Sequence, residues 1–337
     1  MKGVVFAFVL ITVGSCHLNN GLKVQPVAED NSIASPEKEI NRNDSTSGII
    51  YTSADDGLTW QNKSKGLPDG INLTDFTAWD EDLIAATKEH GLFIYNSHTG
   101  AWSNVIAPQQ VKYSIDVVIV FNNNIFIGTQ DGGVIMSADN GVNWKEYNKG
   151  LLNRTIRRFA IINDSLYAGT NEGLYVLNEK KKEWLLKFTE GALQVNGISA
   201  LHNDIFIGTN KGVYKSGKPY VKWQQVLREK SLHNIAVENN TVFAMVYNEL
   251  FVSADQGATW RTGQNGMPAN KYSFHVKQKS GRLFIAQWDG VYAGNGINKW
   301  QLSVKGMPHN FPVTELVVFK NNLVAASSVW FNETTSR

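Results

Sequence analysis

The sequence predicts an all-β fold, and three observations support that prediction. Seven tryptophans recur at intervals of 42, 42, 40, 39, 37 and 40 positions: Trp60, Trp102, Trp144, Trp184, Trp223, Trp260 and Trp300. A short strand-like run and a turn precede each of these tryptophans after the first. Nothing after residue 48 resembles a long amphipathic helix. A repeat of this length is typical of a propeller blade, so we expect a seven-bladed β-propeller.

Each repeat is expected to supply four strands, named a to d in chain order. Strand a is a mostly apolar run such as "IDVVIVF" or "RRFAII", and a tight Asn/Asp turn such as "NNN" or "NDS" follows it. Strand b is a run such as "IFIGT", strand c is a run such as "GVIMS", and strand d carries the repeated Trp. Strand-forming residues bounded by Gly, Asn and Asp turns indicate successive antiparallel hairpins.

The order of these elements predicts how the ring closes. Seven a–b pairs are present, but the first c–d hairpin, "GIIYTSADDGLTW", precedes all of them. We therefore expect this N-terminal hairpin to pair with the last a–b pair, which includes "LVAASS" at 323–328, so that no blade edge stays free. The final residues, "VWFNETTSR", are expected to form a short tail.

The N-terminus predicts export. "MKGVVFAFVLITVGSC" has one Lys, an apolar run too short for a comfortable membrane span, small residues and the only cysteine of the chain. This pattern resembles a bacterial lipoprotein signal, which implies lipidation of Cys16 after cleavage and anchoring to the cell-envelope membrane. The alternative is an ordinary secretory signal, which gives a secreted protein. The expected domains are a signal peptide at 1–15, a flexible tether at 16–47 and the propeller at 48–337.

Composition excludes several classes of function. The 337 residues carry a net charge of +2, so neither a nucleic-acid partner nor a polyanion is indicated. The single cysteine allows no internal disulfide. Phosphate-loop, zinc-ligand and hydrolase motifs are missing, and the seven histidines are scattered singly. We expect no cofactor, no metal and a monomer.

The octapeptide "SADDGLTW" at 53–60 returns as "SADNGVNW" at 137–144 and "SADQGATW" at 253–260. It resembles the Asp-box, or BNR repeat, of sialidases, sortilin-type receptors, xyloglucanases and photosystem assembly propellers. The Asp can accept turn N–H groups, the Gly permits a positive φ, and the Trp buries apolar surface. We expect a structural role for Asp55, Gly57, Trp60, Asp139, Gly141, Trp144, Asp255, Gly257 and Trp260.

The resemblance does not extend to a sialidase active site. Those enzymes have six blades, draw three arginines from several blades and carry an Arg-Ile-Pro sequence. Here the repeat predicts seven blades, and no Arg-Ile-Pro occurs. The resemblance therefore implies a shared fold and not a shared site.

Blade geometry predicts on which face a ligand binds. The a–b and c–d turns lie on one face, and the b–c turns and d–a loops lie on the other, where connections are freer to vary. The d–a loops carry the aromatic residues Tyr113, Tyr272 and Phe311. Exposed aromatic rings beside Arg side chains suit the binding of a carbohydrate or a peptide. The candidate ligand residues are Trp288, Asp289, Tyr247, Glu249, Arg157, Arg158, Asp131, Glu172 and Glu89.

Two functions remain open at this point. The first is a binding or assembly module for an extracellular or cell-envelope glycan or protein. The second is a glycan-active enzyme, a glycoside hydrolase or polysaccharide lyase, in which two rim carboxylates act as acid and base. The same carboxylates also suit ordinary tight turns, so no catalytic residue is assigned. Trp288 is the leading ligand candidate because it lies outside the repeated Trp register.

Overall fold

The computed structural model describes residues 48–105, 112–269, 271–297 and 299–331. The predicted signal peptide, the tether and Cys16 therefore lie outside the described residues, as do residues 332–337. None of the described segments forms a helix with the length and apolar character of a membrane span.

Seven antiparallel four-stranded sheets form the fold. Blade 1 contains β3 (Leu73–Trp79), β4 (Asp82–Thr87), β5 (Gly91–Asn96) and β6 (Ala101–Asn104). Blade 2 contains β7 (Ile115–Phe121), β8 (Asn124–Thr129), β9 (Val134–Ser137) and β10 (Lys145–Glu146). Blade 3 contains β11 (Ile156–Ile162), β12 (Ser165–Thr170), β13 (Gly173–Asn178) and β14 (Glu183–Phe188). Blade 4 contains β15 (Val195–Leu201), β16 (Asp204–Thr209), β17 (Gly212–Gly217) and β18 (Gln224–Arg228).

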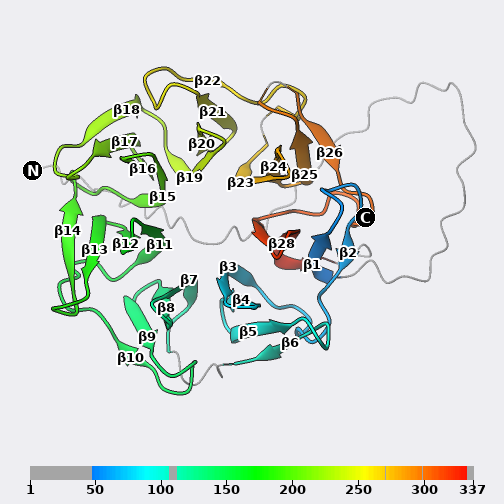
Figure 1. Ribbon diagram of the computed structural model, residues 1–337, viewed down its shortest axis with the longest axis horizontal. Helices are drawn as coiled ribbons and strands as arrows, with labels where there is room; N and C mark the ends of the chain where they lie inside the picture. The colour runs from blue at the N-terminus through cyan, green and yellow to red at the C-terminus, as the bar shows by residue number, and fades with distance from the viewer. Residues whose placement is uncertain (1–47, 106–111, 270, 298, 332–337) are drawn as a thin grey trace, which may run out of the picture. The chain divides into compact units, whose positions relative to one another are not determined.

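Blade 5 contains β19 (Leu232–Glu238), β20 (Thr241–Val246), β21 (Glu249–Ser253) and β22 (Arg261–Thr262). Blade 6 contains β23 (Ser273–Lys279), β24 (Arg282–Gln287), β25 (Gly290–Gly294) and β26 (Gln301–Ser303). Blade 7 contains β27 (Glu315–Phe319), β28 (Asn322–Phe331), β1 (Gly48–Ser53) and β2 (Gln61–Asn62). The first strand named in each blade is the inner one, and each inner strand contacts those of the two neighbouring blades around a central axis (Figure 1). The predicted seven-bladed β-propeller is confirmed.

Blade 7 is assembled from both ends of the described chain, as the order of elements predicts. Its strand order is β2-β1-β28-β27, and the register pairs Tyr51 with Ala325 and Thr52 with Val324. The expectation that a tail begins at residue 329 was wrong, because β28 continues to Phe331, which pairs with Gly48 after a register shift. The pairing with Phe331 gives Gly48, the first residue of β1, a ladder partner that it would otherwise lack.

The hydrophobic core lies between adjacent blades. Strands β8, β12, β16, β20 and β24 are buried at every position after the first, since a neighbouring blade covers each face of the sheet. One apolar cluster, for example, joins Phe126 of blade 2 to Phe159 and Trp184 of blade 3. The continuous apolar runs of the sequence are therefore explained by burial on both faces.

Four of the repeated tryptophans, Trp60, Trp102, Trp184 and Trp300, are fully buried and connect each blade to the one before it. The indole N–H of Trp184 donates to Tyr147 O at 2.8 Å, and its backbone N–H donates to Lys149 O at 2.8 Å. Trp102 and Trp300 repeat both bonds to the preceding blade. Only Trp102 and Trp184 lie within the outer strand; the other five precede it, so their predicted placement in strand d was wrong.

The three repeated octapeptides form closed corners between strands c and d. In blade 7, Gly57 N donates to Ser53 Oγ at 2.8 Å and Thr59 N donates to Asp55 Oδ1 at 2.9 Å. Equivalent bonds occur in the corners that contain Asp139 and Asp255. The Thr59 hydroxyl and amide hold the pKa of Asp55 at about 2. These carboxylates are therefore already used inside the corner.

Candidate functional site

Each inner strand carries an irregularity near its first residue, on the face of the b–c turns. In blades 1 to 6, the register shifts by one residue between Leu73/Asp75, Ile115/Val117, Ile156/Arg158, Val195/Gly197, Leu232/Asn234 and Ser273/His275. Blade 7 has an equivalent irregularity, because two successive residues face Ala326: Thr314 N donates to Ala326 O at 2.8 Å, and Glu315 is paired with Ala326 in the sheet register. Such bulges interrupt the alternation of side chains and re-aim them. The polar residues at these positions form what we call the bulge ring: Asp75, Asp116, Arg157, Arg158, Asn196, His233, Asn234, His275 and Glu315.

Hydrogen bonds connect several neighbouring blades in the first half of the bulge ring, and Asp116 of blade 2 interacts electrostatically with Arg157 of blade 3. Asp75 Oδ2 accepts from Val118 N of blade 2 at 3.0 Å. Arg157 Nε donates to Asn196 Oδ1, and Asn196 Nδ2 donates to Leu232 O of blade 5 at 2.6 Å. The side chains of the ring therefore satisfy backbone groups of the next blade and align the blades around the axis.

The second half of the ring continues this pattern into blade 7. Asn234 Nδ2 donates to Phe274 O of blade 6 at 2.9 Å. His275 Nε2 lies 3.1 Å from Glu315 Oε2, and both side chains are almost fully buried. Asp75 in blade 1 has a pKa raised by burial and, to a smaller extent, by interaction with Glu315. Polar interactions thus run around the whole ring.

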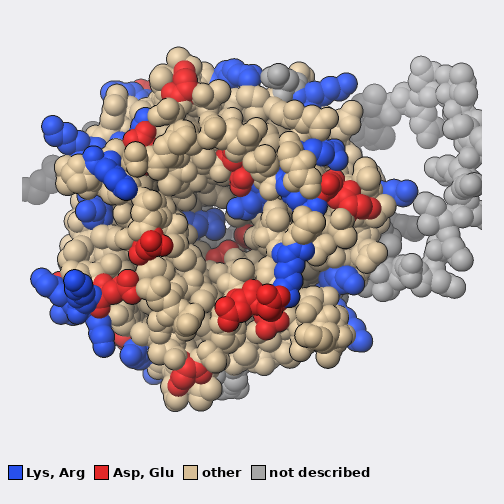
Figure 2. All heavy atoms as spheres, in the orientation of Figure 1, with Lys and Arg blue, Asp and Glu red and all other residues tan. Residues whose placement is uncertain are grey.

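Arg158 reaches the middle of the ring. Its Nη1 lies 4.0 Å from Asp75 Oδ1, although Arg158 belongs to blade 3 and Asp75 to blade 1. The Arg158 side chain therefore passes blade 2 on the axial side. Its Nε is buried and has no hydrogen-bond partner within the described residues. Figure 2 shows that the propeller is hollowed at its centre and that basic and acidic side chains both lie in the hollow.

Burial shifts several proton equilibria in this ring. It raises the pKa of Asp75 to about 7, with a further contribution from Glu315. It raises the pKa of Asp116 to about 6, against the opposing effect of Arg157. Burial also lowers the pKa of His233 to about 3, so its imidazole is neutral at physiological pH. Because Asp75 holds a proton for part of the time, the positive charge of the two arginines is incompletely balanced.

An aromatic wall, composed of Tyr247, Tyr272, Phe274 and Trp288, lies beside the ring on blades 5 and 6. The centroids of Tyr247 and Tyr272 are 5.2 Å apart, and those of Tyr272 and Phe274 are 4.6 Å apart. Trp288 meets Phe274 edge-on at 5.0 Å. Tyr272 also stacks on His233 of the ring at 3.9 Å. Tyr247 is 64% exposed and Trp288 is 36% exposed, so the wall presents aromatic surface at the mouth of the channel.

The structure brings together some of the predicted ligand residues and separates others. Trp288 and Tyr247 join the same aromatic wall, and Arg157 and Arg158 belong to the bulge ring beside it. Glu249 pairs with Lys230 at 2.7 Å, and Asp289 accepts from the Tyr292 hydroxyl at 3.0 Å. The three remaining carboxylates are exposed and form no ion pair in the described part of the chain: Glu89, Asp131 and Glu172.

The two arginines lie at the start of the inner strand β11, within the run "RRFAII" that predicts a strand a. One detail of the expected site differs in the structure. Phe311 was expected among exposed loop aromatics but is fully buried and packs edge-on against Tyr51 at 4.9 Å. It fills the junction between the d–a loop and blade 7, where an apolar ring gains most from burial.

Sequence reasoning missed most of the bulge ring, although the sequence contains a sign of it. Every inner strand has a polar residue or pair near its start, as in "LTDF", "IDVV", "IRRF", "VNGI", "LHNI", "SFHV" and "VTEL". A polar pair in an otherwise apolar strand indicates a bulge or a functional position. Within the described residues, no group of three or more His, Cys, Asp or Glu side chains is arranged to hold a metal.

Comparison with known proteins supports the fold class. No protein-family model and no curated protein sequence matches the chain. The extracellular domain of the putative one component system BT4673 from B. thetaiotaomicron is similar with a TM-score of 0.63 and 14% identity, over 79% of this chain and 38% of that one. YCF48 bound to a D1 peptide is similar with a TM-score of 0.61 and 14% identity, over 81% of this chain and 95% of that one.

PorZ, a surface component of the type-IX secretion system of Porphyromonas gingivalis, gives a TM-score of 0.53 at 12% identity, over 76% of this chain and 35% of that one. The chain thus spans well under two thirds of BT4673 and PorZ. Identities this low establish the fold alone. Fold and site together define the class: a seven-bladed β-propeller with a charged central ring and an aromatic wall at one mouth of its channel.

Proposed function

We propose that this chain is an exported, lipid-anchored binding or assembly module that captures a segment of a partner protein at the channel mouth. The observation that carries the proposal is the position of the aromatic wall directly beside the bulge ring. Tyr247 and Trp288 supply exposed aromatic surface, and the unpartnered Arg158 Nε supplies a buried donor. Aromatic and Arg side chains dominate the affinity of protein interfaces.

Two findings on similar folds support the proposal. YCF48 is bound to a D1 peptide in one of the similar structures, which favours a protein partner, and the similar structure of BT4673 is the extracellular domain of a putative one component system, which favours export. On this proposal, the three octapeptide corners are Asp-boxes with a purely structural role on the opposite face. Binding to a glycan, the other ligand class that the sequence leaves open, is a competing outcome of the same binding test.

A glycan-active enzyme is the second candidate, and one observation favours it. Asp75 and Glu315 interact electrostatically, and burial raises the pKa of Asp75 to about 7. An acid that keeps its proton near neutral pH beside a second carboxyl group is the combination that glycoside hydrolysis uses. These two residues differ from the rim carboxylates that the sequence suggested for this role.

The test is a parallel screen of the purified full chain on a peptide array, on a glycan array and in a reducing-end assay. Saturable binding to peptides without release of reducing ends supports the proposal. Release of reducing ends that disappears in Asp75→Asn supports the enzyme instead. Binding confined to the glycan array would overturn the choice of a protein partner.

Anchoring is tested separately through Cys16. If this cysteine is lipidated, Cys16→Ser should transfer the protein from the detergent-dependent membrane fraction to the soluble fraction, because the acyl chains supply the membrane affinity. Fractionation and immunoblotting measure the change. Unaltered membrane association of the Ser variant would contradict the anchor.

A further inference from the structure

The bulge ring holds two arginines that are adjacent in the chain. Arg157 and Arg158 lie at the start of β11, where the register of the sheet shifts by one residue. Arg157 donates through Nε to Asn196 Oδ1 and through Nη1 to Asn171 Oδ1, the latter at 2.9 Å. Both acceptors are neutral amide oxygens, so these hydrogen bonds orient the guanidinium without balancing its charge.

Arg158 remains accessible from the channel. Its side chain is 23% exposed, and its Nη1 lies 4.0 Å from Asp75 Oδ1, at the outer limit of an ion pair. Backbone amides hold the Asp75 carboxyl group, because Oδ1 accepts from Phe76 N at 2.9 Å and Oδ2 accepts from Val118 N at 3.0 Å. Arg158 Nε is buried and has no hydrogen-bond partner among the described residues. A buried donor of this kind favours a ligand that supplies an acceptor.

The carboxyl groups beside the two arginines are weak counterions. Burial raises the pKa of Asp75 to about 7, with a smaller contribution from Glu315. Burial also raises the pKa of Asp116, which interacts with Arg157, to about 6. Both acids thus hold a proton for part of the time near neutral pH, whereas an arginine keeps its charge. A group that is fully ionised at this pH would pair with Arg158 better than Asp75 does.

The aromatic wall is connected to Arg158 through His233. Tyr272 of the wall stacks on the His233 imidazole with a centroid distance of 3.9 Å. The pKa of His233 is lowered mainly by burial and to a smaller extent by His275 and Arg158, so the guanidinium lies within electrostatic range of the imidazole. A segment that stacks on the exposed Tyr247 therefore lies close to a buried cation.

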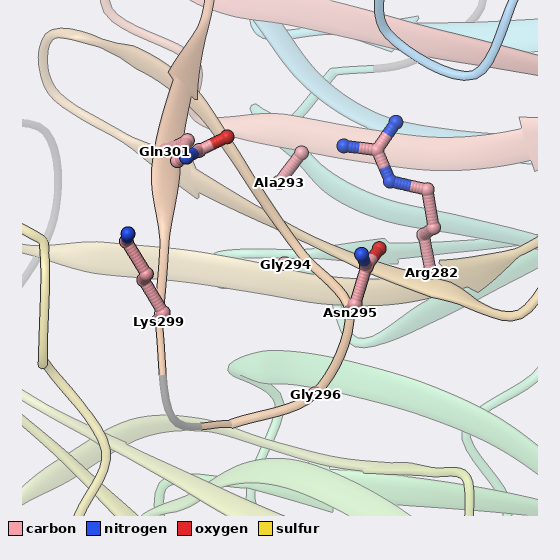
Figure 3. Close-up of a pocket in the computed structure, with 7 residues that line it drawn as sticks. All are labelled: Arg282, Ala293, Gly294, Asn295, Gly296, Lys299 and Gln301. Atoms are coloured by element: carbon pink, nitrogen blue, oxygen red, sulfur yellow. The ribbon is translucent and has the colours of Figure 1, made fainter.

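A second basic surface lies elsewhere, at the c–d corner of blade 6, beside a cavity of about 220 Å³. The residues that line this cavity include Arg282, Asn295, Lys299 and Gln301 (Figure 3). Arg282 already donates through Nη1 to Asp56 O of blade 7 at 3.1 Å, so it serves the junction between blades 6 and 7. The corner is also on the face opposite the aromatic wall, and a segment bound to the wall does not reach it.

We propose that the segment captured at the channel mouth is acidic and that one of its carboxylates pairs with Arg158. This inference rests on the proposed function, because the aromatic wall supplies the rest of the binding surface. A carboxylate accepts from two N–H groups of one guanidinium in a planar fork, and partial burial strengthens such a pair. The carboxylate is an Asp or Glu side chain or the C-terminal group of the partner, since the same contact recognises each of them.

Paired peptide arrays probed with the purified full chain test the proposal. Each acidic peptide has a twin with Asn and Gln in place of Asp and Glu, and each sequence is made with a free and with an amidated C-terminus. Titration calorimetry then measures the tightest binders and their twins. Removal of the carboxylate should weaken binding at least about tenfold, as expected for the loss of one charge-assisted hydrogen bond. The change that weakens binding, in the side chains or at the C-terminus, identifies the source of the carboxylate.

Three variants assign the contact to Arg158. Arg158→Gln should bind the acidic peptide at least about tenfold more weakly and should no longer distinguish it from its neutral twin. Arg154→Gln is the matched control, since the Arg154 side chain is 53% exposed on the loop before β11, and it should retain the preference. Asp75→Asn should bind the acidic peptide more tightly, because a carboxyl group that competes for Arg158 is removed. Melting temperatures show that each variant is folded during the titration.

The outcomes separate this inference from the proposed function. Binding to no peptide would overturn the proposed function and this inference with it. Equal binding of acidic peptides and their neutral, amidated twins would overturn this inference alone, and so would an undiminished preference in folded Arg158→Gln. Loss of binding in Asp75→Asn together with full binding in Arg158→Gln would indicate a cationic segment and would also overturn it. Equal weakening by Arg154→Gln and Arg158→Gln would remove the assignment to Arg158.

Discussion

Asp75 shows how a single residue of the bulge ring links folding to pH. Its carboxyl group accepts from Val118 N and Phe76 N, yet burial and Glu315 raise its pKa from 3.8 to about 7. The native state therefore retains a proton that the unfolded chain loses in this pH window. The free energy of unfolding should fall as the pH rises through the window, because the unfolded state binds fewer protons.

His233 affects the pH dependence of the free energy of unfolding with the opposite sign. Burial lowers its pKa from 6.5 to about 3, so between these values the unfolded chain binds a proton that the native state does not. This contribution makes the free energy of unfolding fall as the pH drops. The two effects overlap between 3.8 and 6.5, and a melting curve of the wild type alone cannot separate them.

The first prediction is therefore a difference measurement on Asp75→Asn. The variant has no carboxyl proton at this position, while His233 and Asp116 titrate in both proteins. The melting temperature of the variant minus that of the wild type should become more positive from about pH 4 to about pH 8. Calorimetry at matched ionic strength measures this difference. A difference that does not change with pH would show that Asp75 ionises normally.

At the scale of single elements, the sequence predicts the strands of each blade but not the contacts made by the bulge ring. Tryptophan spacing and turn residues predict the strands because these features recur in every blade. The ring contacts depend on a one-residue register shift, which moves Arg158 or His275 to a face that simple alternation does not predict. Contacts such as Arg158 with Asp75 also join positions two blade segments apart in the chain, and a single sequence does not indicate which distant residues meet.

The loop after the outer strand is a second repeated element, with "KGLP", "KGLL", "NGMP" and "KGMP" in four blades. Its glycine adopts a positive φ and lies against the backbone of the next blade's Trp. At Gly150, φ is +86° and an added Cβ would lie 2.2 Å from Trp184 O. Only glycine permits this approach, which allows the Trp N–H groups to reach the loop carbonyls.

The second prediction concerns this contact between blades. Gly150→Ala should lower the free energy of unfolding by clearly more than the roughly 1–2 kcal/mol of left-handed strain, because it also displaces the Trp184 backbone. Gly281→Ala is the matched control, since Gly281 has φ of +76° and open space around its Cβ position. Chemical denaturation followed by Trp fluorescence measures both variants. Equal losses would mean that the approach to Trp184 is unimportant.

At the scale of the whole molecule, blade 7 determines whether the ring is closed. Strand β1 pairs with β28, so the N-terminal hairpin covers an edge that the C-terminal strands would otherwise expose. Lys279, Ser280 and Arg282 of blade 6 also contact Asp56 in the corner of this hairpin. Closure therefore depends on sheet hydrogen bonds and on polar contacts with the neighbouring blade.

The third prediction tests closure by deletion of residues 48–60. The deletion removes β1 and the buried Trp60, so the edge of β28 is exposed and aggregation or a clearly lower melting temperature is expected. Deletion of 13 residues from the predicted tether at 20–32 controls for chain length. Light scattering and calorimetry compare both proteins. A protein without 48–60 that melts like its parent would rule out a structural role for the two-ended blade.

The central claim is that ligands bind at the channel mouth, and a comparison of two tryptophans tests it most directly. With the tightest-binding peptide of the array, calorimetric titration should show at least about tenfold weaker binding by Trp288→Ala, with an almost unchanged melting temperature. Trp184→Ala should instead lower the melting temperature, because Trp184 is 2% exposed and joins blades 2 and 3, and it should retain affinity while folded. Full affinity in Trp288→Ala together with loss of binding in folded Trp184→Ala would contradict the proposed site.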